Sequence, residues 1–572
     1  MALRFKLILA VFFAFYWSNA QDTITTEKLI IVKQYSPTVN DAFKVKQKPN
    51  ESNKLEIQPK SVNYKFISIP VASTFTPAKG RASGVILPPK PRFYNSYARL
   101  GFGNFTTGLG ELYSDFSIDR QKNISIDFSH LSSQGGIEDV LVDDHYFNTS
   151  LGLGLHSTER NLKWNVGINL NHDIFNWYGI QLPTNYVIQD DVAQTYLELG
   201  LEGGVQFYDT WVKTANLNYY NFSDDFNSAE NFIDLELKSE LLVGYEQVLD
   251  LQLKLNYLTT TYDESLDVSD YSFYNVSVLP RTQFNIAGIE IDAGAKVVLN
   301  ANVEESETNF FIYPKISANY NITESLNVFT IIDGDLSQNT YRDFANENPF
   351  VSPNLRISPT NKMYDASLGL QTKLGKLTAV AKLGYADFDN TYFFKHNYEA
   401  PSIATVNLEP NNAYSQNNSF EIVYDDMTQL NAGLSFNYTP DEDLDLGLDV
   451  NYFAYNTNNE VEAWNRPEIE AKFYGHYNFT DRWRFGLTTF FVGERQAFNG
   501  TTTSVVTGNQ QTNTQSLDSF IDLNFALDYA ITERFSVFVN GNNLLSANQP
   551  RWKAYQVQGI QVLGGLTYKF DW

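Results

Sequence analysis

Apolar and polar residues alternate over long stretches of this chain, from about residue 94 to its end. Period-two alternation predicts strands with one apolar and one polar face. The clearest examples are nine or more residues long, whereas strands of soluble sheets average about five or six residues. Such length, with a nearly unbroken aliphatic face, favours strands that cross a membrane. These examples are Leu162–Asn171, Leu249–Tyr257, Asp443–Tyr452 and Ile521–Tyr529.

About 22 strands of this kind can be counted. They begin near residues 94, 107, 124, 147, 162, 195, 214, 230, 249, 272, 290, 309, 326, 363, 377, 421, 443, 469, 483, 520, 535 and 560. Connections after even-numbered strands are short, and those after odd-numbered strands are often long. We therefore predict an all-β fold over residues 92–572, a transmembrane antiparallel up-and-down barrel. In an outer membrane, both termini would be periplasmic and the long loops extracellular.

The final strand, Ile560–Trp572, is apolar and aromatic on one face and mostly polar on the other. Tyr568, Phe570 and Trp572 lie on the apolar face, and the chain stops on the last of them. This ending resembles the terminal strand of bacterial outer-membrane proteins, which the barrel-insertion machinery reads. We expect this strand to pair with the strand near Tyr94 and so to close the ring.

The N-terminal part of the chain has a different composition. Residues 1–20 have a short basic start, an apolar run and a small-residue cleavage site, which predicts a secretory signal peptide. Residues 21–91 hold eight of the 19 prolines, and residues 22–92 carry 12 Lys or Arg against five Asp or Glu. Proline at this density disfavours a regular helix or sheet. We predict a Pro-rich basic segment, which either is a disordered periplasmic leader or enters the barrel lumen.

Composition narrows the possible functions. Aromatic residues make up 15% of the chain, as the interfacial girdles of a membrane barrel require. Cysteine is absent, which excludes disulfides, thiolate metal sites and cysteine catalysis. The net charge of −25 argues against a nucleic-acid partner. It is compatible with an outer leaflet of lipopolysaccharide, whose anionic groups are bridged by divalent cations.

Residues that could carry chemistry are sparse, and we expect no enzyme activity and no cofactor. The six histidines have no metal-ligand spacing, and His145 after Asp143 and Asp144 is the one candidate ligand group. Acidic loop clusters such as Asp425-Asp426 could hold Ca²⁺, but their spacing favours solvated loops. Carboxylates that alternate with lipid-facing aliphatics should point into the lumen, because charge in lipid is costly. These candidates are Asp443, Asp445, Asp449, Asp522 and Asp528.

Two stretches resemble TonB-dependent receptors, the 22-stranded transporters of the outer membrane. Residues 348–362 read NPFVSPNLRISPTNK and lead into the strand Tyr364–Leu374. They are similar to the family's NP-x-L-x-P-E loop and the strand after it. Asn543-Leu544-Leu545 and the closing GGLTYKF strand are similar to the family's penultimate segment and C-terminus. The cleavage at Gln21 and the loop sequences are similar to those of the Bacteroidetes branch.

The chain departs from that family at its N-terminus. Family members carry a folded plug inside the barrel, whereas residues 21–91 are too short and too Pro-rich for one. No plug motif is found, so the resemblance assigns no residue to siderophore or TonB binding, and engagement of TonB is doubtful.

Two functions therefore stay open. The first is transport of a nutrient or other solute across the outer membrane of a Gram-negative cell. The alternative is a plug-less barrel that acts as a scaffold subunit of an assembly or secretion complex. Either role implies a protein partner, a surface lipoprotein for transport or an envelope complex for the scaffold. A lumen this wide must be occupied by something if the envelope is to stay sealed.

Overall fold

The computed structural model describes residues 93–180, 192–244, 247–266, 268–397, 414, 417–503, 510–546 and 549–572. All of them belong to one compact unit, Lys90–Trp572. The predicted signal peptide and the Pro-rich basic segment lie outside the described residues, and their assignment stays a prediction.

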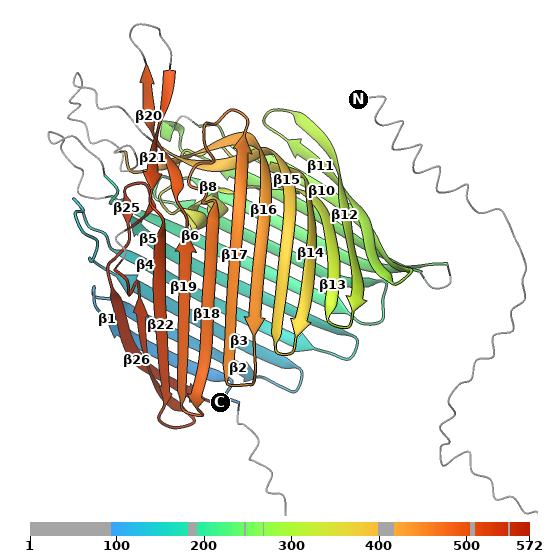
Figure 1. Ribbon diagram of the computed structural model, residues 1–572, viewed down its shortest axis with the longest axis horizontal. Helices are drawn as coiled ribbons and strands as arrows, with labels where there is room; N and C mark the ends of the chain where they lie inside the picture. Colours follow the sequence, from blue (N-terminus) through green and yellow to red (C-terminus); the bar gives the residue numbers. More distant parts are fainter. Residues whose placement is uncertain are drawn as a thin grey trace, which may run out of the picture. The chain divides into compact units, whose positions relative to one another are not determined.

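Twenty-two antiparallel strands form one closed sheet (Figure 1). Neighbours in the ring follow chain order, and β1 (Ser96–Gly103) pairs with β26 (Gln561–Phe570) to close it. The other barrel strands are β2 Gly108–Ser117, β3 Lys122–Ser133, β4 Tyr146–Thr158, β5 Leu162–Asn176, β6 Ala193–Phe207, β7 Val212–Asp224, β8 Ala229–Val243, β9 Gln247–Thr261, β10 Tyr271–Ile286, β11 Ile289–Asn302, β12 Glu307–Thr323, β13 Leu326–Ser337, β14 Thr360–Leu374, β15 Leu377–His396, β16 Phe420–Tyr438, β17 Leu444–Thr457, β18 Ile469–Thr480, β19 Trp483–Val492, β22 Phe520–Ala530 and β23 Phe535–Asn542. The predicted all-β barrel is confirmed, with every strand starting within three residues of its predicted position.

The outer surface of the sheet is apolar and the inner surface is polar. On β14 and β15, Leu368 and Leu383 face each other across the ladder and are 58% and 64% exposed. Gly369 and Lys382 form the next pair in register, on the opposite face of the same two strands. Exposed apolar side chains recur in this way on most strands of the ring, whereas a protein in water rarely exposes a large contiguous apolar patch. Exposed aliphatic side chains outside and charges inside are the arrangement of a barrel in lipid.

Helices contribute little to the described part of the chain. Among the described residues, no helix has the length and hydropathy needed to cross a membrane. The helical elements are the short α2 (Tyr341–Glu347) and the 3₁₀ turn η2 (Glu264–Leu266).

The connections alternate in length as predicted. Those after even-numbered strands of the ring have at most five residues, and the long connections lie at the opposite end. The long end carries two additional hairpins, β20 (Arg495–Thr503) with β21 (Gln510–Leu517) and β24 (Pro550–Trp552) with β25 (Tyr555–Gln556). The first of these projects beyond the barrel strands (Figure 1).

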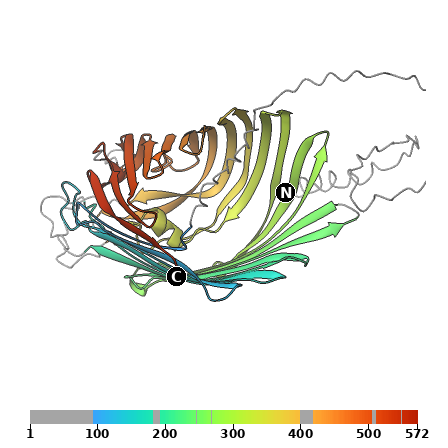
Figure 2. The same cartoon turned by 90° about the horizontal axis from the view of Figure 1, so that it is seen from below.

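The largest buried cluster lies inside the ring and towards the long-loop end. It joins aromatic residues of strands β6, β7 and β10 to residues of the β13–β14 connection and of β25. Viewed along the barrel, α2 lies within the ring of strands (Figure 2). The core of this protein is therefore built by a loop that folds inward, since the sheet itself faces lipid on one side and a polar lumen on the other.

Candidate functional site

The connection between β13 and β14 folds into the barrel, and we call residues 338–359 the inner segment. It begins with α2, whose N-cap Thr340 accepts a hydrogen bond from the Asp343 backbone N–H at 3.0 Å. Threonine at this position satisfies one of the free N–H groups of the first turn. The helix ends at Glu347, and its C-cap Asn348 has extended backbone because the ring of the following Pro349 disfavours helical backbone. Local sequence thus sets both ends of the helix.

A buried carboxylate of the barrel wall holds the start of α2. Glu230 of β8 is completely buried, and its two oxygens accept hydrogen bonds from the backbone N–H groups of Tyr341 at 2.7 Å and Arg342 at 3.3 Å. The hydroxyl groups of Tyr220 and Tyr271 donate to the same carboxylate at 3.2 and 3.1 Å. Burial of a carboxylate is costly unless such donors surround it. These four hydrogen bonds attach the inner segment to β7, β8 and β10.

Two further side chains of α2 reach the same part of the wall. The Arg342 guanidinium donates to Glu198 of β6 at 2.7 Å and lies 4.4 Å from the centre of the Tyr220 ring. The Tyr341 hydroxyl donates to Asp224 of β7 at 2.7 Å. The first turn of α2 is therefore fixed by three carboxylates from three adjacent strands.

Backbone carbonyls of the inner segment accept hydrogen bonds from wall aromatics. Pro349 O accepts from the Trp177 indole N–H at 3.0 Å and from the Tyr196 hydroxyl at 2.9 Å. Leu355 O accepts from the Tyr262 hydroxyl at 2.7 Å. Buried carbonyls need such partners, and the aromatic rings also fill the space around the segment.

The opposite wall is reached through β16. Val351 forms a parallel bridge with Phe420, in which Phe420 N–H donates to Phe350 O at 3.0 Å and Ser352 N–H donates to Phe420 O at 2.8 Å. The Phe350 ring stacks on Tyr555 with ring centres 3.5 Å apart. The inner segment therefore crosses the lumen from β6–β8 to β16 and the β24–β25 hairpin.

The tyrosines that hold the inner segment stay protonated at neutral pH. Burial raises the pKa of Tyr341 well above its ordinary value, and the nearby Asp224 carboxylate raises it further. Burial likewise raises the pKa of Tyr262 and of Tyr555. A protonated phenol is needed for each of these hydroxyls to donate its hydrogen bond.

A cavity of about 270 Å³ lies between the inner segment, the β24–β25 hairpin and the ends of β4 and β5. Polar side chains and aromatic rings both line it, including His145, Asn176, Tyr178, Phe350 and Gln556. His145 Nδ1 and the Asn176 amide nitrogen are 2.8 Å apart, and the Tyr178 hydroxyl donates to Gln556 O at 2.8 Å. The cavity has room for a small organic molecule with polar groups.

The carboxylates of the two candidate metal-ligand groups accept hydrogen bonds from backbone N–H groups. Asp144, beside His145, is buried and accepts hydrogen bonds from Gly135 N–H at 2.6 Å and Ile137 N–H at 3.2 Å, so it orders its own loop. Asp425 similarly accepts from the backbone N–H groups of residues 458–460 at 2.7 to 3.0 Å. In the part of the chain that the structure describes, no group of three or more His, Asp or Glu could hold a metal ion.

The carboxylates that the sequence assigned to the lumen fall on β17, on β22 and in one turn. Asp445 and Asp449 alternate with Leu446 and Leu448 on β17. Asp445 accepts a hydrogen bond from Asn437 at 3.2 Å, and Asp449 lies in register with Lys472 of β18. Their role in the lumen stays a prediction.

The other three of these five carboxylates, Asp443, Asp522 and Asp528, have different surroundings. Asp522 and Asp528 alternate with the exposed Ile521 and its neighbours on β22, and Asp528 lies in register with Arg484. Asp528 also lines a polar cavity of about 380 Å³. Asp443 precedes β17 and lies in the turn, where its carbonyl accepts from Asn478 N–H at 2.8 Å.

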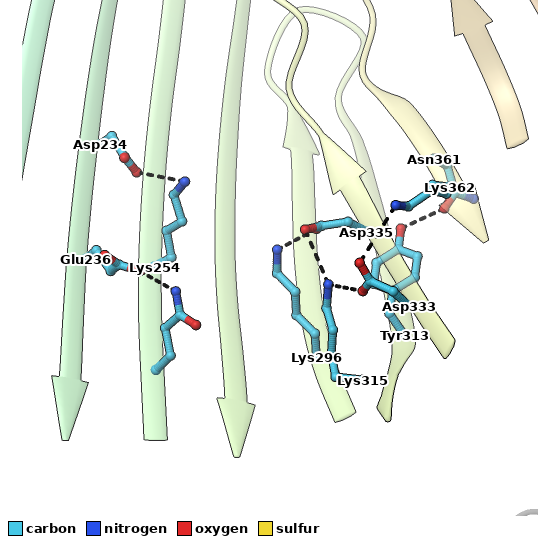
Figure 3. A network of polar contacts seen from close by, with 11 residues as sticks. Asp234, Glu236, Lys254, Lys296, Tyr313, Lys315, Asp333, Asp335, Asn361 and Lys362 are labelled. Carbon is cyan, nitrogen blue, oxygen red and sulfur yellow. Dashed lines mark hydrogen bonds and ion pairs between the residues drawn. The ribbon is translucent and has the colours of Figure 1, made fainter. Parts of the chain in front are cut away.

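A network of opposite charges on β11–β14 was not expected from the sequence (Figure 3). Lys296 pairs with Asp335, and Lys315 pairs with Asp333. Lys362 adds a contact to Asp333 at 3.7 Å. In the sequence, each of these residues indicates only that it lies on the polar face of its strand. Which lysine meets which aspartate follows from the register between neighbouring strands. Lys362 also lies 3.9 Å from Asp365, so three lysines meet three aspartates and this part of the wall carries balanced charge.

The terminal aromatic residues lie where the predicted strand ends. Tyr568 is exposed on the outer face, and its ring stacks with that of Phe570, the ring centres being 6.0 Å apart. The Trp572 indole N–H donates to Ser114 of β2 at 2.6 Å. The expected pairing of the last strand with the first is confirmed, whereas recognition by the insertion machinery stays a prediction.

Comparison with protein families finds no matching family model. A search of curated proteins also finds no match. Solved structures do match, and the three described below share 8 to 12% sequence identity with this chain. The FrpB iron transporter of Neisseria meningitidis has a TM-score of 0.63 at 8% identity, over 84% of this chain and 82% of that one.

Two Pseudomonas aeruginosa receptors are similar to the same extent. The pyoverdine outer membrane receptor FpvA has a TM-score of 0.60 at 12% identity, covering 84% of this chain and 79% of its own. The ferric enterobactin receptor PfeA has a TM-score of 0.60 at 11% identity, covering 83% and 80%. At such identities the likeness establishes the fold: this chain is a 22-stranded barrel of the kind found in these outer-membrane receptors.

Proposed function

We propose that the protein is a receptor-like barrel that takes up a nutrient or other solute across the outer membrane. The proposal is carried by one observation, the inner segment that crosses a closed 22-stranded lumen. A lumen of this width is useful to a transporter only if it is closed in the resting state. The fold likeness to FrpB, FpvA and PfeA and the resemblance to TonB-dependent receptors support the same role.

The orientation that fits this role places the short turns and both termini in the periplasm. The long loops then face outward, and the 270 Å³ cavity beside Phe350 lies near the outer mouth. A solute arriving from outside would meet this cavity, whose wall includes Pro349 and Phe350 of the inner segment. The partner that we propose for such uptake is a surface lipoprotein that delivers the solute.

Loss of uptake in the native host tests the proposal. A deletion strain, complemented by wild type or by an empty vector, would be grown with one nutrient limiting at a time, beginning with iron and ferric siderophores, the ligands of the similar receptors. Transport predicts a growth defect and loss of labelled uptake for at least one solute, both restored by the wild-type gene.

Affinity purification from native membranes completes the test. A ligand-binding lipoprotein as the main partner would support uptake. Normal growth on every nutrient, with envelope-assembly proteins co-purifying in fixed stoichiometry, would refute transport and identify a scaffold subunit.

A further inference from the structure

We propose that the inner segment is a built-in closure, which keeps this barrel impermeable without help from residues 1–92 or from another chain. Glu230 is the residue that holds this closure in place. The inference concerns permeability and holds whichever solute the barrel serves. It rests on the burial of the apolar side chains of the inner segment and on the groups that hold the segment.

The apolar side chains of the inner segment are enclosed, whereas its polar residues Asp343, Asn346, Glu347 and Arg356 are exposed. Tyr341 and Val351 are fully buried, and Phe344, Leu355 and Ile357 are at most 4% exposed. A loop that merely hung in a wide, water-filled lumen would expose its apolar side chains on several sides. Burial of this degree means that wall and hairpin residues surround the apolar side of the segment.

The attachments lie on opposite walls of the ring. On one side Glu230, Glu198 and Asp224 hold α2. On the other side Phe420 forms the backbone bridge, and Tyr555 stacks on the segment. Because the inner segment is attached to both walls, with aromatic side chains between the attachments, it blocks the lumen in the way a separate domain otherwise would.

Glu230 is the position where this closure is most easily released. Its carboxylate accepts from four donors, two in the inner segment and two in the wall. Glutamine has nearly the same volume, but its amide NH₂ would face donors and cannot accept from them. Buried donors left without acceptors are destabilising. Glu230→Gln should therefore loosen the start of α2 without emptying the site.

The same strand offers a matched control. Glu236 of β8 also lies on the inner face, six residues towards the short turns, and contacts Gln252 and Lys238. It makes no hydrogen bond or ion pair with the inner segment. Glu236→Gln removes the same charge from the same strand and should leave the closure intact.

Single-channel recording of the full-length protein in planar bilayers tests the proposal. We expect wild type and Glu236→Gln to be closed, and Glu230→Gln to open at least tenfold more often. A chain that lacks residues 22–90 should stay closed. Opening of that chain but not of Glu230→Gln would overturn the proposal, because closure would then belong to the basic N-terminal segment.

A second variant keeps the test decisive if Glu230→Gln fails to insert. Residues 341–357 would be replaced by a Gly-Ser linker, which keeps both flanking strands and removes most of the inner segment. Insertion is checked by the heat-dependent shift of the barrel band on gels. A wide, stable pore is expected, whereas an inserted linker variant that stays closed would refute the proposal.

Discussion

Leu370 and Gln371 of β14 are adjacent residues on opposite faces of the barrel wall, and substituting each by arginine tests which face meets lipid. Leu370 is 49% exposed among other aliphatic side chains. The strand path from Tyr364 to Leu374 rises about 25 Å, if each residue advances about 3.3 Å at a tilt of about 40°. That height equals the apolar band of an outer-membrane barrel, and Leu370 lies near its middle.

The expected difference between the two variants follows from this depth. Arginine on the lipid face near the midplane costs about 2–4 kcal/mol of folding free energy. Arginine at Gln371 meets the polar lumen, so we expect a change within about 0.5 kcal/mol, as for an exposed surface position.

Folding titrations of both variants in phospholipid vesicles with guanidinium, followed by tryptophan fluorescence, would measure the two free energies. Equal losses, or a larger loss for Gln371→Arg, would refute the assignment of faces.

Three further predictions concern the ends of the barrel and its lumen. Burial lowers the pKa of Lys553 to about 8. The unfolded chain keeps this proton up to about pH 10.4, so between about pH 8 and pH 10 it binds more protons than the folded chain. The β24–β25 region should therefore gain stability as the pH rises over this range. Lys553 Nζ donates to Phe498 O of β20 at 3.0 Å. Hydrogen exchange of β20 residues 495–503, corrected for intrinsic rates, should therefore slow over that range, and Lys553→Met should abolish the effect. Deleting residues 570–572 should slow insertion, measured as the heat-modifiable fraction in membranes, whereas Lys569→Ala should not; equal insertion of both would contradict an assembly role for the terminus. The lumen carboxylates to be replaced by asparagine are Asp445, Asp449, Asp522 and Asp528. Their replacement should lower the cation selectivity of the open linker variant. An unchanged reversal potential would contradict a role of these residues in selectivity.

The barrel could be predicted because its signals are local. A side chain two residues along a strand returns to the same face, so Leu162–Asn171 reports its own orientation without reference to any other strand. Connection lengths are also read directly from the chain, and their alternation requires an even number of strands. Strand starts near residues 94 and 560 therefore implied the closing pair before any contact was known.

The interior could not be predicted in the same way. Residues 348–362 were recognised as a family-like loop, but their sequence does not say that the loop folds inward. Glu230 reads as one more polar residue on the lumen phase of its strand, like Glu236. Its four donors come from β7, β10 and α2, which lie up to 112 positions away in the chain.

The sequence by itself thus determined a membrane barrel of 22 strands, with short turns at one end and long loops at the other. Only the tertiary structure decided which loop enters the lumen and which groups hold it there. The physical reason is that the face of the strand on which a side chain lies follows from its alternation with its neighbours in sequence. Burial of Tyr341, Val351 and Glu230, in contrast, depends on walls that closure of the whole ring brings together.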